Sequence, residues 1–248
     1  MSITIRSAQT IGNGVKLRGD NTQYVRPDDP LDKLFEFDAS NYTSGTTLLD
    51  ISGNDRHAII VGNPTWSNTA GGCFAFAGDA SKYIEVPGSS TGWGLNTAAN
   101  NPTASFSVWA KISAYGFYQH IAGWRGGLNL WFLILNDGFT TEARFDGGNS
   151  YDIGIDYRPY YDNWAYITFV VDSALAQTRL YINGTQVGYR DGITGSFGGG
   201  ANPFRLGAHP SGPFPTNGAI GGATAYARAL TQQEVTAEFN RTKTRYGL

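Results

Sequence analysis

Acidic residues spaced along strand-like segments are the first candidates for chemistry in this sequence, because they could cleave glycosidic bonds. Retaining glycoside hydrolases place two carboxyl groups about 5–5.5 Å apart, on either side of the bond. Glu36-x-Asp38 begins such a pattern, but positions 40 and 41 are uncharged. Alternation along a strand turns Phe35 and Phe37 inward, so we expect Glu36 and Asp38 to form a solvent-exposed face.

Other residue combinations fit catalytic patterns no better. Asp152 and Asp156 share a face of a predicted strand, but roughly 13 Å of strand rise separates them, too far for a retaining pair. Residues 88–92, Gly-Ser-Ser-Thr-Gly, have the letters of a nucleophile elbow, yet Pro87 precedes them and no helical pattern follows. The histidines lack the i, i+4 spacing of a metal pair, and we expect each to be structural or exposed. They are His57, His120 and His209. The sequence therefore predicts a protein that is not an enzyme.

Aromatic residues in predicted loops provide a second kind of chemistry. Flat rings can stack on the apolar faces of sugars, while nearby Asn, Asp and Arg side chains hydrogen-bond to hydroxyl groups. The same residue types are enriched in protein interfaces, and they can also cap the ends of a sandwich. Three interpretations stay open: a partner interface, a core cap and a carbohydrate site. The candidates are Trp93, Tyr115, Phe117, Tyr118, Tyr157, Arg158, Tyr160 and Tyr161.

Short strands must position these residues, since two-residue alternation recurs along most of the chain. In the segment 105–112 the apolar residues at 106, 108, 110 and 112 share one face, which predicts a half-buried strand. Trp131 to Leu135 is apolar on both faces and predicts a central strand. Asn183-Gly184 after an apolar run is typical of a two-residue hairpin turn.

A single helix is predicted, close to the C-terminus. Thr231 and Glu234 have the spacing of a capping box, and Leu230 with Val235 fits a hydrophobic staple. About a dozen short strands with one short helix predict an all-β fold. We expect an antiparallel two-sheet jelly-roll sandwich.

Composition narrows the class of partner. The 248 residues carry a formal net charge of -2, and charged residues make up only 15% of them. These values argue against nucleic-acid binding through bulk charge and against a polybasic membrane contact. Cys73 is the only cysteine, so an intrachain disulfide is excluded. The N-terminal residues lack the pattern of a signal peptide, so we expect synthesis in a cytoplasm.

The first 30 residues differ from the rest, being poor in aromatic residues and ending in Pro-Asp-Asp-Pro. They are predicted to be an N-terminal arm, with the jelly-roll domain spanning 31–248. The stretch is either a first strand of the domain or an arm that docks on a partner through main-chain hydrogen bonds. The arm residues proposed to dock are Ile3, Ile5, Arg6, Val15, Leu17 and Arg18.

Several motifs, in order along the chain, are similar to those of laminin-G-like, concanavalin A-like jelly rolls. The match begins at Asp50-Ile-Ser-Gly-Asn-Asp-Arg-His57 and includes Phe106-Ser-Val-Trp109-Ala-Lys. It ends at Tyr226-Ala-Arg-Ala-Leu230-Thr-Gln-Gln-Glu234. The resemblance implies the fold but says little about function.

The chain departs from this family at its calcium site. The family commonly has two acidic residues before the last strand, where this chain has Gly221 and Gly222. Calcium requires six to eight oxygen ligands, several of them from carboxylates. Asp79 is the remaining candidate ligand, so we expect no cofactor, with calcium as the one metal left to consider.

The opening residues, Met-Ser-Ile-Thr-Ile-Arg-Ser-Ala-Gln-Thr-Ile-Gly-Asn-Gly, resemble those of structural proteins of tailed bacteriophages. That resemblance implies a capsid decoration or tail fibre protein located in the virion, with copies of itself or capsid and tail subunits as partners. The predicted function is therefore a non-catalytic binding module of an assembly. The alternative is a lectin for host surface glycans, and a glycan hydrolase is the third hypothesis.

Overall fold

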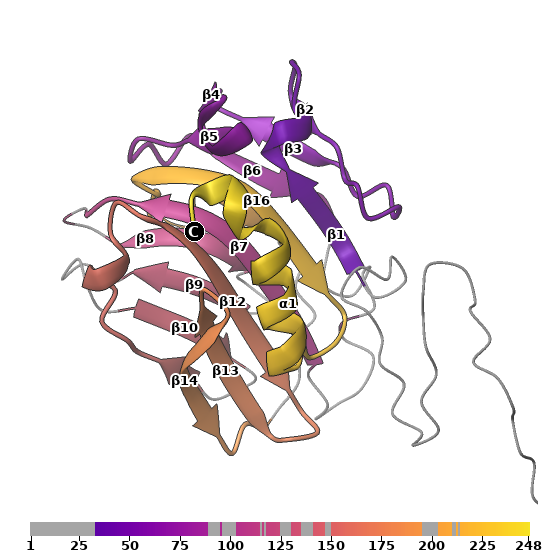
Figure 1. Cartoon of the computed structure of the whole chain (residues 1–248), viewed down its shortest axis with the longest axis vertical. Coiled ribbons are helices and arrows are strands. Elements are labelled where there is room, and N and C mark those ends of the chain that lie inside the picture. Colours follow the sequence, from indigo (N-terminus) through magenta and orange to yellow (C-terminus); the bar gives the residue numbers. More distant parts are fainter. Residues whose placement is uncertain are drawn as a thin grey trace, which may run out of the picture.

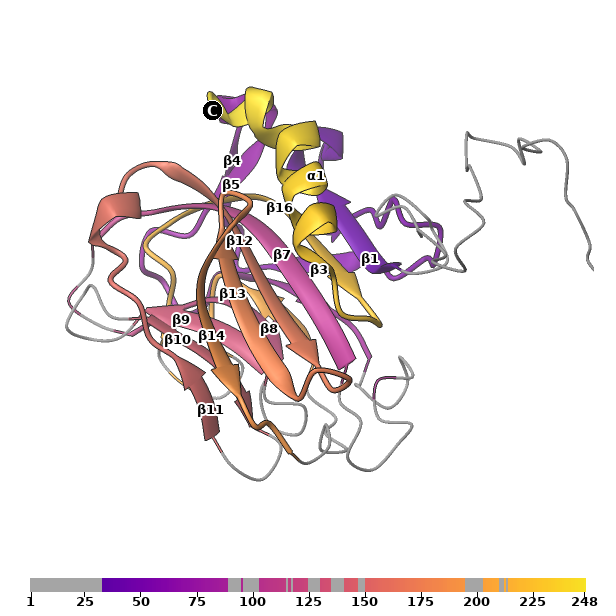
Figure 2. The same cartoon turned by 60° about the horizontal axis from the view of Figure 1, so that its bottom comes forward.

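The computed structural model describes residues 33–88, 95, 103–114, 116, 118–124, 130–134, 141–146, 150–194, 203–209, 212 and 214–248. Two antiparallel eight-stranded sheets pack face to face (Figures 1 and 2). The chain passes repeatedly from one sheet to the other, which is the jelly-roll arrangement. No helix in the described ranges has the length and apolar character needed to cross a membrane.

One sheet, here called the helix-side sheet, has the order β14-β13-β12-β7-β16-β5-β4, and β1 also pairs with β16. Long strands with continuous pairing form its centre, and β7 and β12 align over nine residues from 103 to 111. The strands are β1 (Lys33–Asp38), β4 (Thr65–Ser67), β5 (Cys73–Ala75), β7 (Thr103–Ile112), β12 (Trp164–Asp172), β13 (Gln177–Ile182), β14 (Thr185–Asp191) and β16 (Gly218–Tyr226).

The other sheet, here called the far sheet, has the order β11-β10-β9-β8-β15-β6-β3-β2. Its strands are β2 (Thr47–Leu48), β3 (Ala58–Val61), β6 (Tyr83–Val86), β8 (Gln119–Trp124), β9 (Leu130–Ile134), β10 (Thr141–Asp146), β11 (Ser150–Ile153) and β15 (Phe204–Leu206). The predicted central strand at 131–135 corresponds to β9, an interior strand of this sheet.

Apolar side chains from both sheets fill the space between them. Phe35, Phe106, Phe169 and Phe204 are fully buried there, and Phe106 contacts the rings of both Phe169 and Phe204. Four 3₁₀ turns lie at Ala39–Asn41, Thr69–Gly71, Arg158–Tyr160 and Lys243–Tyr246. The predicted all-β antiparallel sandwich with one short C-terminal helix is confirmed.

Local predictions hold where neighbouring residues determine the geometry. Asn183 and Gly184 both have positive φ between β13 and β14, as a type I′ turn requires. The helix α1 (Gln232–Thr242) begins at the predicted N-cap, and both hydrogen bonds of the capping box between Thr231 and Glu234 are present. Leu230 and Val235 are buried in the same cluster.

The prediction of a half-buried strand at 105–112 is wrong. Its alternate residues Ser105, Ser107 and Trp109 are buried as well. They lie on the outer face of the helix-side sheet, which α1 crosses (Figure 2). Ser105 contacts the segment before α1 through Arg228 and Leu230, and Trp109 packs on Phe239 of α1 and on Tyr246. Indole Nε1 of Trp109 donates a hydrogen bond to Oγ1 of Thr242 at 2.9 Å. A helix distant in sequence therefore gives the sheet a second buried face.

Candidate functional site

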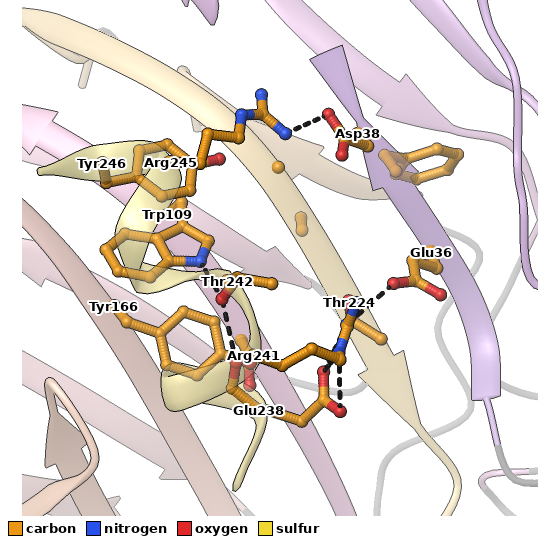
Figure 3. A pocket seen from close by; sticks show the side chains of 14 residues that line it. Glu36, Asp38, Trp109, Tyr166, Thr224, Glu238, Arg241, Thr242, Arg245 and Tyr246 are labelled. Carbon is orange, nitrogen blue, oxygen red and sulfur yellow. Dashed lines mark hydrogen bonds and ion pairs between the residues drawn. The ribbon is translucent and has the colours of Figure 1, made fainter. Parts of the chain in front are cut away.

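A pocket lies beneath the C-terminal helix, between α1, β1 and the outer face of the helix-side sheet (Figure 3). β1 contributes Glu36 and Asp38 to it, and α1 contributes Glu238 and Arg241. The pocket therefore contains three carboxylates, Glu36, Asp38 and Glu238. Two of them could form a catalytic pair, although the sequence pattern at 36–41 lacks the second acid of such a pair.

Each of these carboxylates has a cationic partner. Glu36 contacts Nζ of Lys33 at 2.6 Å and Arg241 at 3.3 Å, while Arg241 also binds Glu238 at 2.6 Å. Asp38 pairs with Arg245 (Figure 3). The expectation that Glu36 and Asp38 form a solvent-exposed face is therefore wrong: the C-terminal residues fold over this face and pair with both acids.

The aromatic residues of the pocket are equally committed to internal contacts. The rings of Trp109 and Tyr246 stack at 4.0 Å between centroids, and Tyr166 lies 5.0 Å from Trp109. Burial raises the pKa of both tyrosines above the usual value. The pocket has a volume of about 50 Å³, enough for a few water molecules and far below the size of a typical ligand site. We interpret it as the contact that holds the helix to the sheet.

The motif that opens the family resemblance also has a structural role. The Asp50 carboxylate accepts hydrogen bonds from the backbone N–H groups of Glu36, Ser52 and Arg56, and Nδ1 of His57 accepts one from Asp50 N–H at 3.1 Å. Asn54 donates to the carbonyl oxygen of Lys33. The loop 50–57 therefore satisfies the backbone of β1 along the edge that does not pair with β16, which protects an otherwise open edge.

A second polar region crosses the outer face of the far sheet. Strand registers align Ile59, Glu85, Arg205, Gly123 and the backbone of Trp131 on one line. The line continues through Arg144 to Asp152. Neighbouring strands lie about 4.8 Å apart, so the line from Glu85 to Asp152 spans roughly 24 Å. We call its charged residues, with Glu142, the charged row: Glu85, Arg205, Arg144, Glu142 and Asp152.

Ion pairs hold the side chains of the charged row in place. Arg205 Nε lies 2.7 Å from Glu85, and its guanidinium lies 4.0 Å above the ring of Tyr83. Arg144 makes a two-pronged contact with Asp152 at 2.6 and 2.9 Å. These side chains keep partial exposure, from 17% for Arg205 to 40% for Asp152. The row thus presents ordered donors and acceptors at the surface.

The sequence interpretation missed the charged row, although one signal pointed to it. Glu85 lies between Ile84 and Val86, and Arg205 lies between Phe204 and Leu206, all four of which are buried. A charged residue flanked by two buried apolar residues in a strand must face outward. Only pairing between strands shows that these isolated charges lie on one line.

The predicted loop aromatics have mixed outcomes. Tyr157 is fully buried, with its ring near those of Phe132, Tyr160 and Tyr161, so its prediction as a contact residue is wrong and it belongs to the core. Tyr160 and Tyr161 are half-buried and pack against that core.

Two other candidates keep exposed surface. Arg158 pairs with Asp156 at 2.7 Å. Tyr118 is half-buried, and its ring lies 5.2 Å from that of Phe214. Trp93, Tyr115 and Phe117 lie outside the described residues, as do the arm residues Ile3, Ile5, Arg6, Val15, Leu17 and Arg18.

The structure explains why glycines occupy the two positions where the family has acidic residues. A Cβ atom at Gly221 would lie 2.5 Å from the Tyr246 hydroxyl oxygen, and one at Gly222 would lie 2.8 Å from the carbonyl oxygen of Phe37. Acidic side chains there would displace the C-terminal turn and β1. Asp79 accepts hydrogen bonds from Ser81, which lower its pKa. Within the described ranges, no group of three or more His, Cys, Asp or Glu side chains could hold a metal ion.

The fold brings together two histidines that are far apart in the sequence. The rings of His120 and His209 meet edge to face at 5.3 Å, and Phe214 lies beside His209. Both histidines are buried. His57 is exposed at its loop.

Comparison with family models gives a match over residues 78–236 to Laminin_G_3, described as the concanavalin A-like lectin/glucanases superfamily. This match covers more than half of the chain. The chain belongs to the concanavalin A-like lectin/glucanases superfamily. It has a lectin-like binding-domain fold, as the motifs between Asp50 and Glu234 indicated. A comparison with curated proteins gives no significant match.

Solved structures with the same fold include toxin binding domains. The binding domain of botulinum neurotoxin DC in complex with rat synaptotagmin II matches at 15% identity and a TM-score of 0.67, covering 86% of this chain and 52% of that one. A structure of botulinum neurotoxin type C, whose cell entry depends on interaction with two ganglioside molecules, matches at 14% identity and a TM-score of 0.66, covering 87% of this chain and 52% of that one. The binding domain of Paraclostridial Mosquitocidal Protein 1 matches at 15% identity and a TM-score of 0.64, covering 86% of this chain and 52% of that one.

These similarities show the fold alone. The chain spans about half the length of each of these neighbours. They are binding domains of toxins and not virion proteins, and the bacteriophage resemblance stays a prediction.

Proposed function

We propose that the chain is a non-catalytic binding module that recognises a glycan through the charged row of the far sheet. The observation that carries this proposal is the alignment of ordered, partly exposed charged side chains on one line of the far sheet, from β6 and β15 to β10 and β11. The family adds support, because its description includes lectins. Among assembly, sugar binding and hydrolysis, sugar binding fits this surface best.

The side chains of the row have the chemistry that sugar hydroxyl groups require. Guanidinium groups donate pairs of parallel hydrogen bonds and carboxylates accept them. Because Arg205 is already held by Glu85 and by the ring of Tyr83, less side-chain entropy is lost when a ligand binds. The same holds for Arg144 between Glu142 and Asp152.

The shape of the row favours an extended ligand. The line from Glu85 to Asp152 spans roughly 24 Å, with the pair Glu85–Arg205 at one end and Arg144–Asp152 at the other, on either side of the buried Gly123. Charged groups of both signs occur along the row, which suits a polysaccharide rich in hydroxyl groups better than one of high charge.

A glycan array followed by titration calorimetry tests this function. Arg205→Ala should weaken binding by about 10- to 100-fold, because a hydrogen bond to a charged group is worth about 1.5–3 kcal/mol. Arg190→Ala is the matched control, since Arg190 is exposed on β14 of the other sheet. Circular dichroism of each variant shows whether it folds, and Arg205→Lys keeps the charge without the planar fork.

Three outcomes would contradict the proposal. Absence of binding at millimolar concentrations of every glycan would exclude a lectin function. Loss of binding in Tyr160→Ala or Trp93→Ala, with Arg205→Ala unaffected, would move the site to the predicted loop aromatics. Release of new reducing ends from a host polysaccharide would show that the module is catalytic.

A structural role in a virion remains the second proposed function, and it rests on the resemblance of the opening residues to bacteriophage proteins. Deleting residues 2–28 should leave the domain folded and abolish incorporation into particles. Electron microscopy of particles assembled with the truncated chain measures this. Full incorporation would exclude an assembly role for the arm.

A further inference from the structure

An exposed apolar patch lies where β1, β2 and β3 meet, at the opposite end of the far sheet from β11 (Figure 1). We propose that this patch is the docking surface for the leading segment of the same chain, residues 1–32. The patch consists of Leu49, Ile51 and Ile59, whose exposed fractions are 51%, 47% and 45%. This inference is independent of glycan binding.

Strand register places two of the patch residues, Leu49 and Ile59, beside each other, and Ile51 follows Leu49 by two positions. Thr47 pairs directly with Ile59. Leu49, two residues after Thr47, is therefore the diagonal neighbour of Ile59 on the same face, at about 7–8 Å. Residues 48, 50 and 52 are buried, whereas 47, 49 and 51 are exposed. This alternation turns the apolar side chains outward together. Contiguous exposed apolar side chains on a soluble domain indicate an interaction surface.

The backbone at this corner also has an open edge. β2 is the last strand of the far sheet among the described residues, and it is only two residues long. A strand edge exposes unpaired N–H and C=O groups, which another extended segment can satisfy. Apolar side chains and free main-chain groups together are suited to an extended peptide.

The leading segment ends at this corner. Its last residue precedes Lys33, whose carbonyl oxygen accepts a hydrogen bond from Asn54 at 2.7 Å. In the same loop, Ile51 N–H donates to Glu36 O at 2.9 Å. Three residues of β1 therefore separate the start of the domain from the patch, about 10 Å of strand. Thirty-two extended residues reach roughly 100 Å, so the distance is covered several times over.

The sequence of the leading segment fits such a surface. Ile3 and Ile5 share one face of an extended chain, as do Val15 and Leu17. Each pair offers apolar side chains at the two-residue spacing of a strand. Covalent connection gives the segment a high effective concentration at its own patch, and for this reason we assign the same chain, rather than another copy, as the occupant.

Photo-crosslinking of the full-length chain tests the contact. p-Benzoylphenylalanine replaces Ile59 in one protein and Leu175 in a control, because Leu175 is 61% exposed on the turn between β12 and β13. Peptide mapping should find crosslinks from position 59 to residues 1–32 within a single chain, and none from position 175. Absence of these crosslinks, equal yields from both positions, or crosslinks only between chains would overturn the proposal.

Hydrogen exchange provides a second readout that does not depend on the crosslinker. In a full-length chain carrying Ile3→Asp, Ile5→Asp, Val15→Asp and Leu17→Asp, amides of residues 47–51 and 58–61 should exchange about tenfold faster. Protection of β12 should be unchanged, which shows that the domain is folded. Equal exchange of the patch amides in both proteins would also overturn the proposal.

Discussion

The outer faces of the two sheets carry similar charged residues, but these residues have different roles in the structure. On the helix-side sheet, Trp109 and Tyr166 are covered by the C-terminal helix, and the acids Glu36 and Asp38 pair with arginines of that region. On the far sheet, Arg205 pairs within its own face and stays partly exposed. Both faces carry charged residues at alternate strand positions. The C-terminal helix packs over the face of the helix-side sheet, whereas the charges of the far sheet pair with each other.

This comparison shows why a count of acidic residues does not identify a site. Glu36 and Asp38 attract attention in the sequence, yet their partners are Lys33, Arg241 and Arg245, which makes them part of the helix contact. The charged row has no recognisable sequence motif, and its ion pairs join neighbouring strands of one sheet, such as Arg205 with Glu85. The ion pairs of the covered face instead join the sheet to the C-terminal region, as in Asp38 with Arg245. What each charged group pairs with, rather than its residue type, separates the two faces.

The largest expected effect comes from breaking the covered face. Trp109→Ala removes the ring that stacks on Tyr246 and the hydrogen bond to Thr242. Loss of a buried tryptophan should lower the free energy of unfolding by about 3–5 kcal/mol, measured by urea denaturation. Tyr189→Ala, at a position 57% exposed, should change it by less than about 0.5 kcal/mol. Equal effects of the two changes would contradict the assigned burial.

A smaller loss should follow from crowding the same contact. Gly221→Ala places a Cβ atom 2.5 Å from the Tyr246 hydroxyl oxygen, so the turn at Lys243–Tyr246 must shift. We expect a cost of about 1–3 kcal/mol in unfolding free energy. Gly116→Ala is the control, since nothing lies within 4 Å of a Cβ atom there. Tolerance of Gly221→Ala would mean that Tyr246 is not held tightly.

Alkaline pH should lower the stability of the fold, because buried tyrosine hydroxyls must then ionise. Burial raises the pKa of Tyr157 above its usual value of about 10. The raised pKa contributes stability that is fully present below pH 10 and is lost as the pH rises towards the folded-state value. Unfolding free energies at pH 8 and 11 measure this loss, and Tyr157→Phe should reduce it. Among the described residues the Tyr157 hydroxyl has no hydrogen-bond partner, so the variant should keep its stability at pH 8.

The N-cap of α1 should contribute less to the unfolding free energy than the packing of the helix against Trp109. Thr231→Ala removes the hydroxyl that accepts the Glu234 N–H at 3.3 Å, at a typical cost of about 1 kcal/mol. Thermal unfolding followed by circular dichroism measures the change. A loss as large as that of Trp109→Ala would show that the cap, and not the ring stack, holds the helix.

The smallest stability effect is expected on the far sheet. Arg205→Ala breaks a partly exposed ion pair with Glu85, so its unfolding free energy should fall by no more than about 1 kcal/mol. The same variant should lose glycan binding. A large loss of stability would assign the charged row to the structure of the sheet, as on the opposite face.

The sequence by itself determined the local geometry and the fold class. The Asn183-Gly184 turn and the capping box at Thr231 and Glu234 form as predicted, because both depend on residues within four positions of each other. Alternation predicted that Phe35 and Phe37 face the core, and both are buried. The ordered motifs from Asp50 to Glu234 indicated the superfamily that the family match shows.

Tertiary structure alone decided which outward faces remain open. Whether Glu36 meets solvent depends on Arg241, 205 residues away in the chain, and the line from Glu85 to Asp152 exists only through strand registers. Alternation states that a side chain leaves the core, but it contains no information on what covers that side chain. Covering a surface is a long-range property of packing, and it is here that the predictions for residues 36, 38 and 157 were wrong.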